Sequence, residues 1–124
     1  MPVLPAPTAA THVLGATRFT SLATPSRGST DVSVWRVEIP PGPDAVPHRL
    51  TRQEVFVLQQ GRARVQLGDE VFDVETGGVI IVPPDTDFAL CAAGDSVMEA
   101  LCVLPAGGQA ILPGGEPFTP PWAE

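Results

Sequence analysis

Residues 42–61 read GPDAVPHRLTRQEVFVLQQG, and this stretch decides the fold. A proline-rich corner leads to His48, and an extended run of residues begins at Glu54. Side chains of an extended chain alternate between two faces, so positions 48 and 50 share a face with positions 54, 56 and 58. The side chains expected to point inward are His48, Leu50, Glu54, Phe56 and Leu58. The stretch therefore predicts an apolar barrel wall that carries one imidazole and one carboxylate, and packing alone does not explain the carboxylate.

Outside this stretch, short runs rich in β-branched residues recur between Gly, Pro and Asp residues. Helical periodicity is weak throughout, and the pattern is typical of an all-β sandwich or barrel. The expected strands are residues 18–23, 31–39, 54–59, 62–67, 70–75, 79–82, 87–92 and 97–104. We expect residues 54–75 to form a meander of hairpins. We also expect the last two strands to pair with each other.

The chain has 124 residues, of which 44% are apolar, and this predicts one domain with a real core. Residues 1–10 are expected to form an N-terminal arm, and residues 11–104 the barrel domain. Residues 105–124 form a tail with five prolines and four glycines, which argues against any regular strand or helix there. Because the tail also carries large apolar residues, we expect it to pack on the barrel or on a partner subunit.

The composition excludes several functions. The chain has no lysine and no tyrosine, so Schiff-base chemistry, pyridoxal phosphate anchoring and tyrosine acid–base catalysis are ruled out. A net charge of −7 with scattered arginines argues against nucleic acid and against an anionic membrane surface as partners. No apolar run is long enough to span a membrane, and the first residues do not resemble a signal peptide. We therefore expect a soluble, cytoplasmic protein.

The quoted stretch resembles the first motif of the cupin family. Gly42, His48, Glu54 and Gly61 fall at the spacing of that motif, while Leu50 stands where the family has a second histidine. The resemblance covers most of the chain, from about residue 21 to residue 104.

Residues 77–88, GGVIIVPPDTDF, are similar to the second cupin motif. Gly77 and Pro83 match it. Asp85 stands at the position of the second glycine, and Phe88 at the position of the final histidine. This second match is weaker by itself, but it lies at the right distance from the first.

The resemblance implies a double-stranded β-helix of the cupin or jelly-roll type, with a pocket that usually holds a divalent metal on three histidines and one glutamate. Only His48 and Glu54 of those four ligands are present, and two protein ligands bind a metal weakly. We therefore expect either no cofactor or a weakly bound divalent metal at these two residues. Asp85 and Asp87 are nearby donors, but Asp85 lies in a turn and alternation directs Asp87 away from Phe88.

His48 and Glu54 each have a structural and a functional interpretation. His48 is either an imidazole bonded to a backbone carbonyl near the barrel mouth, or a pocket base or ligand. Glu54 is either paired with Arg52 or Arg64, or part of a catalytic dyad with His48. In such a dyad the carboxylate raises the pKa of the histidine and orients its tautomer.

Two functions remain open. The first is a metal-free or weakly metal-binding module whose pocket, lined by Leu50, Phe56 and Phe88, holds a small apolar molecule oriented by His48 and Glu54. The alternative is a cupin enzyme that acts on a small aromatic or polyketide-like compound. It would be a cyclase, isomerase or dioxygenase, either metal-assisted or using the two polar residues for acid–base catalysis.

We also expect a homodimer, because small open barrels leave edge strands that need cover. The tail is either a lid over the pocket or a dimer contact.

Overall fold

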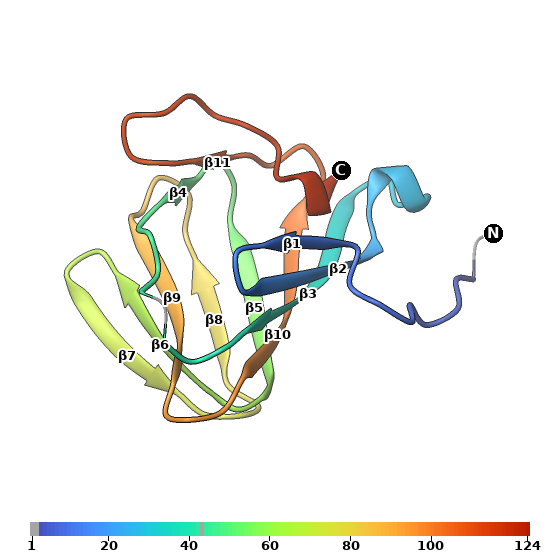
Figure 1. Ribbon diagram of the computed structural model, residues 1–124. Coiled ribbons are helices and arrows are strands. Elements are labelled where there is room, and N and C mark those ends of the chain that lie inside the picture. Colours follow the sequence, from blue (N-terminus) through green and yellow to red (C-terminus); the bar gives the residue numbers. More distant parts are fainter. Residues whose placement is uncertain (1–2, 43) are drawn as a thin grey trace.

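The computed structural model describes residues 3–42 and 44–124, and its regular structure is almost entirely β-strand (Figure 1). The first two residues of the expected arm and Pro43 of the proline-rich corner lie outside the described residues. The strands are β1 His12–Leu14, β2 Thr17–Ala23, β3 Val32–Ile39, β4 Arg49–Leu50, β5 Glu54–Gln60, β6 Arg62–Leu67, β7 Glu70–Val74, β8 Val79–Val82, β9 Phe88–Ala93, β10 Met98–Pro105 and β11 Ala110–Ile111. Short 3-10 turns occupy Pro25–Arg27 and Pro121–Ala123. Within these described ranges, no helix is long and apolar enough to cross a membrane.

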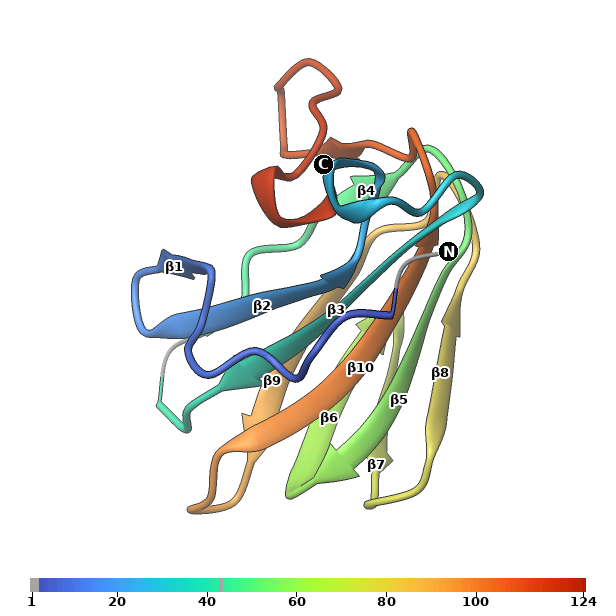
Figure 2. The ribbon, with the colours of Figure 1, turned by 90° about the vertical axis from the view of Figure 1, so that its right-hand side faces the viewer.

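The strands form two layers. A six-stranded sheet has the order β1-β2-β3-β10-β5-β8, and a three-stranded sheet has the order β7-β6-β9. Figure 2 shows the larger sheet in front of the smaller one. A small third sheet, β11-β4, lies at one end of the barrel (Figure 1). Every strand pair is antiparallel, so the expected all-β jelly-roll barrel is confirmed.

The order of pairing differs from the expected meander. β6 and β7 form the predicted hairpin, from Ala63 opposite Val74 to Leu67 opposite Glu70. However, β5 pairs with β10 and β8 and does not pair with β6, and β9 pairs with β6 and does not pair with β10. The predictions of a β5–β6 hairpin and of pairing between the last two strands are therefore wrong. The physical reason is that these short connections carry the chain from one sheet to the other.

Gly61, in the connection from β5 to β6, shows how closely two of these connections pack. Its φ is +75°, a left-handed conformation that favours glycine. A Cβ at this position would lie 2.5 Å from the carbonyl oxygen of Val97, in the connection that leads to β10. The last glycine of the first motif is therefore required because the β5–β6 connection packs closely against the β9–β10 connection.

The core lies between the two sheets, and the predicted alternation holds along β5. Glu54, Phe56 and Leu58 are buried, whereas Val55 and Val57 are only half-buried. The largest fully buried side chains include Phe88, Met98 and Leu104. Among the buried residues of the described chain, Glu54 alone carries an ionisable carboxyl group.

The tail packs on the barrel of its own chain, across the end where β4 and β11 pair (Figure 1). The indole of Trp122 stacks on Phe19 with ring centres 3.6 Å apart and planes 7° from parallel. The hydroxyl groups of Ser21 and Ser33 donate hydrogen bonds to the carbonyls of Trp122 and Ala123, at 2.7 and 2.6 Å. Contrary to the expectation from proline content, the tail contains the two-residue strand β11, which supplies the pairing partner of β4.

Candidate functional site

A cavity of about 640 Å³ occupies the inside of the barrel. Strands β2, β3, β5, β9 and β10 supply about half of the residues that line it, and the others come mainly from residues 44–48 and from the tail. The sequence-predicted site residues that line it are His48, Leu50, Glu54, Phe56 and Phe88. The fold thus brings all five to one space, from two motifs that are separated in the chain.

The two motifs meet at His48 and Phe88. Each of these residues donates its backbone N–H to the carbonyl of the other, at 3.0 and 2.9 Å, so they face each other in an antiparallel bridge. Their rings are tilted by 47° with centres 4.2 Å apart. Phe88 also contacts Phe56, with ring centres 6.0 Å apart. The position of the missing histidine is therefore filled by an aromatic ring that packs against the histidine that is present.

Asp85, which stands at the second glycine position of the second motif, adopts a conformation typical of glycine. Its φ is +57°, in the left-handed region that Asp tolerates better than most residues. Its N–H donates to the carbonyl of Leu50 at 2.9 Å, which ties the turn to β4. The turn that carries Asp85 is therefore held beside β4 by a backbone hydrogen bond.

His48 is half-buried at the cavity wall. Its Nδ1 lies 3.0 Å from the carbonyl oxygen of Val46, which suits a neutral ring that donates from Nδ1 and leaves Nε2 as an acceptor. Burial lowers the pKa of His48, and the hydrogen bond to Val46 offsets only part of that effect. A dyad with Glu54 would raise the pKa of His48, whereas its surroundings lower it. Within the described chain, His48 and Glu54 share neither a hydrogen bond nor an ion pair.

Glu54 begins β5 and is only 4% exposed. Neither arginine expected to pair with it does so: Arg52 is exposed, and Arg64 binds Asp73 at 3.0 Å on the outer surface. Among the described residues, no side chain forms a hydrogen bond or ion pair with Glu54. Burial raises the pKa of Glu54 to about 8, so its carboxyl group is largely protonated at neutral pH.

Sequence reasoning missed several cavity residues. Cys102 on β10 lies opposite Phe56 and lines the cavity, and burial together with the charge of Glu54 raises the pKa of its thiol. Trp35 and Phe19 line the cavity from β3 and β2. Alternation could have placed these two rings on one face of their strands, but not in the same cavity as β5.

The donor atoms at this site do not fit a resident mononuclear metal. The four positions at which a cupin usually carries ligands hold His48, Leu50, Glu54 and Phe88, and two of these side chains have no donor atom. Among the described residues, no group of three or more histidine, cysteine, aspartate or glutamate side chains is close enough to hold a metal ion. Two protein donors leave most of a coordination shell unfilled.

The neighbouring carboxylates do not complete the shell. Asp87 points outward, as alternation predicts, and binds Arg49 at 2.6 Å. The hydrogen bond from Arg49 holds the pKa of Asp87 below its usual range. Asp85 is exposed and is not part of the cavity wall.

Comparison with known proteins gives the same family as the two sequence motifs. Residues 35–104, more than half of the chain, match the family model described as a cupin domain. An uncharacterized protein of Methanocaldococcus jannaschii is 29% identical over 65 residues, which are 52% of this chain and 52% of that protein. The match thus spans about half the length of this curated relative.

Two solved structures share the fold. A cupin-like protein of Thermotoga maritima superposes with a TM-score of 0.70 at 20% identity, over 77% of this chain and 74% of that one. A cupin 2 conserved barrel domain protein of Rhodopseudomonas palustris superposes with a TM-score of 0.69 at 16% identity, over 90% and 75% of the two chains. At such low identity these likenesses bear on the fold alone, whereas the family model matches the sequence itself. With both motifs on one barrel and this match over most of their span, the chain belongs to the cupin family.

Proposed function

We propose that this cupin binds a small, mainly apolar molecule inside its barrel and does so without a resident metal. The observation that carries the proposal is the cavity itself. Its volume of about 640 Å³ lies in the range of small-molecule sites, which bury their ligands among apolar side chains and orient them with a few polar groups. Glu54 and His48 line this cavity, and in our proposal they are the polar groups that orient the ligand.

The tail supports the same proposal. Leu112, Phe118 and Trp122 come from the tail and line the cavity at its mouth. Leu112 and Phe118 are partly exposed, while Trp122 is held by its stack on Phe19. A ligand inside the barrel would cover these apolar surfaces, which gives the tail a role as a lid.

The experiment is a titration with N-phenyl-1-naphthylamine, a neutral dye that fluoresces in apolar surroundings. We expect saturable binding that weakens at least threefold in Phe118→Ala. Phe72→Ala is the matched control, because Phe72 has a similar exposure but lies on β7 outside the cavity wall. Absence of saturable binding, or equal weakening in both variants, would contradict the proposal.

An acid–base enzyme is the second candidate. It is favoured by the opposite effects of burial on two groups of one cavity, because burial raises the pKa of Glu54 and lowers the pKa of His48. A protonated carboxyl group and a neutral imidazole are the states that a general acid and a general base need. If the protein turns over a small aromatic or polyketide-like compound, Glu54→Gln should abolish turnover while dye binding persists. Unchanged turnover would remove Glu54 from the mechanism.

A further inference from the structure

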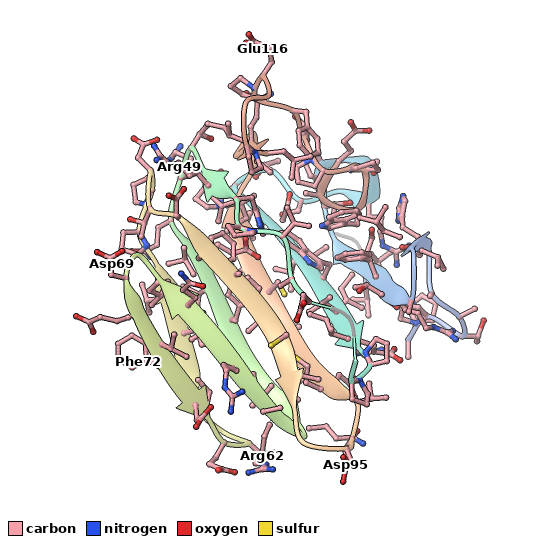
Figure 3. The ribbon with its side chains drawn as sticks, turned by 60° about the vertical axis from the view of Figure 1, so that its left-hand side comes forward. Arg49, Arg62, Asp69, Phe72, Asp95 and Glu116 are labelled. Carbon is pink, nitrogen blue, oxygen red and sulfur yellow. The ribbon has the colours of Figure 1, made fainter. Side chains whose placement is uncertain are left out.

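The aromatic residues of the chain gather at the cavity. The sequence has five phenylalanines, two tryptophans and no tyrosine. Six of these seven rings line the cavity: Phe19, Trp35, Phe56, Phe88, Phe118 and Trp122. Figure 3 shows the seventh, Phe72, at the outer edge of the smaller sheet. An apolar ligand alone does not require aromatic walls, because aliphatic side chains remove apolar surface from water equally well.

The charges around the cavity have one sign. Its charged lining consists of Glu54 in the inner wall and Asp44 at the exposed rim. All seven arginines lie in the described part of the chain, and none of them lines the cavity. Figure 3 shows Arg49 and Arg62 at opposite ends of the molecule, and Arg49 is bound to Asp87 outside. An anionic ligand would therefore meet no positive side chain inside the barrel.

The carboxyl group of Glu54 faces the cavity without a protein partner. The side chain is more than nine-tenths buried, and no described residue forms a hydrogen bond or ion pair with it. Because the described chain has no fully buried side-chain oxygen or nitrogen without a hydrogen bond, the carboxyl oxygens of Glu54 must be open to the cavity. A carboxylate in such a place is costly unless an opposite charge offsets the loss of water. A cation in the cavity would supply that charge, and the electron-rich faces of aromatic rings would attract the same cation.

We propose that the cavity selects an organic cation, an ammonium ion with apolar substituents, held between the carboxylate of Glu54 and the aromatic walls. This inference rests on the proposed binding function and names its ligand class. A neutral ligand that accepts a hydrogen bond from a protonated Glu54 is the competing class, but it would draw no charge-based attraction from the rings. The cavity volume accommodates an aryl or alkyl group beside a trimethylammonium head.

The test compares benzyltrimethylammonium with neopentylbenzene, which has the same shape and no charge. Both are titrated at pH 8 and low ionic strength by displacement of N-phenyl-1-naphthylamine. We expect the cation to bind at least tenfold more tightly than the neutral compound. Glu54→Gln should weaken the cation at least tenfold and the neutral compound less than threefold. The control Glu70→Gln makes the same chemical change at an exposed position on β7 outside the cavity wall, and it should change both affinities less than threefold.

A second variant keeps the test independent of the folding of Glu54→Gln. Phe118 is partly exposed, so Phe118→Leu should fold normally, and it should weaken the cation more than the neutral compound. If the wild type binds the two compounds with equal affinity, or if the variants lose affinity for both compounds equally, the proposed preference for a cation is overturned. Dye binding would then still support an apolar binding site. If dye, cation and neutral compound all fail to bind, the proposed function fails as well.

Discussion

Replacing Glu54 by glutamine is expected to remove most of the pH dependence of stability that the barrel interior creates. Burial raises the pKa of Glu54 from 4.5 to about 8, so the folded protein holds this proton at pH values where the unfolded chain has lost it. Between pH 4.5 and 8, the folded state therefore binds more protons than the unfolded state. The associated stability is fully present below pH 4.5 and is lost as the pH rises to 8.

The size of the effect follows from the shift. A difference of about 3.5 pKa units corresponds to about 5 kcal/mol of unfolding free energy, of which roughly 4 kcal/mol falls between pH 5 and pH 9. Glutamine has nearly the same shape and cannot ionise, so Glu54→Gln should lose this slope. The free energy of unfolding of the variant, measured relative to that of the wild type, should therefore be about 4 kcal/mol higher at pH 9 than at pH 5.

The assay is urea unfolding of both proteins at pH values from 5 to 9, followed by tryptophan fluorescence. The lowered pKa of His48 contributes a slope of opposite sign, since stability from His48 is lost as the pH falls below 6.5, but both proteins contain His48 and the difference cancels it. Glu70→Gln is the matched control, because it makes the same chemical change at an exposed site on β7 and should follow the wild type. Parallel curves for the wild type and Glu54→Gln would refute the reasoning that Glu54 is buried without a partner.

Three further predictions concern packing and assembly. Gly61→Ala should lower the free energy of unfolding by about 2 kcal/mol or more, because the added methyl group clashes with the Val97 carbonyl and the left-handed backbone is strained for alanine. The control Gly68→Ala has φ +58° and open space around it, so it should show only the backbone strain. Equal losses of stability in urea unfolding would contradict this account. Trp122→Ala should lose the stack on Phe19 and speed the release of bound dye in stopped-flow fluorescence, with an unchanged release rate counting against a lid. We also expect a homodimer, and a monomeric mass in light scattering at micromolar concentration would contradict it.

Much of the candidate site was predictable because it depends on local spacing. The positions of His48, Leu50, Glu54 and Phe56 follow from alternation along one short stretch, and a one-residue shift would have reversed the faces of all of them. Phe88 was predictable from its position at the end of the second motif, where the family has a histidine. These residues line one cavity as their pattern indicated, while their role in binding stays a prediction.

The pairing of strands was not predictable in the same way. A short glycine turn after β5 is compatible with a hairpin, and also with a crossing to the other sheet. The choice depends on which sheet has room for the next strand, and that is decided by β10, which is distant in sequence and inserts between β3 and β5. The same long-range arrangement brings Trp35 and the tail to the cavity, which alternation within one strand does not reveal.

The sequence by itself determined the all-β class and the face on which each motif residue lies, because strand propensity and side-chain alternation act over a few neighbouring residues. Its resemblance to the two cupin motifs implied the type of barrel and the loss of two metal-ligand positions. Only the tertiary structure decided that Glu54 meets no arginine, that His48 binds a backbone carbonyl, and that six aromatic rings surround one space. Burial and charge pairing depend on which distant strands face each other, so the electrostatic character of the cavity exists only once the two sheets and the tail have closed around it.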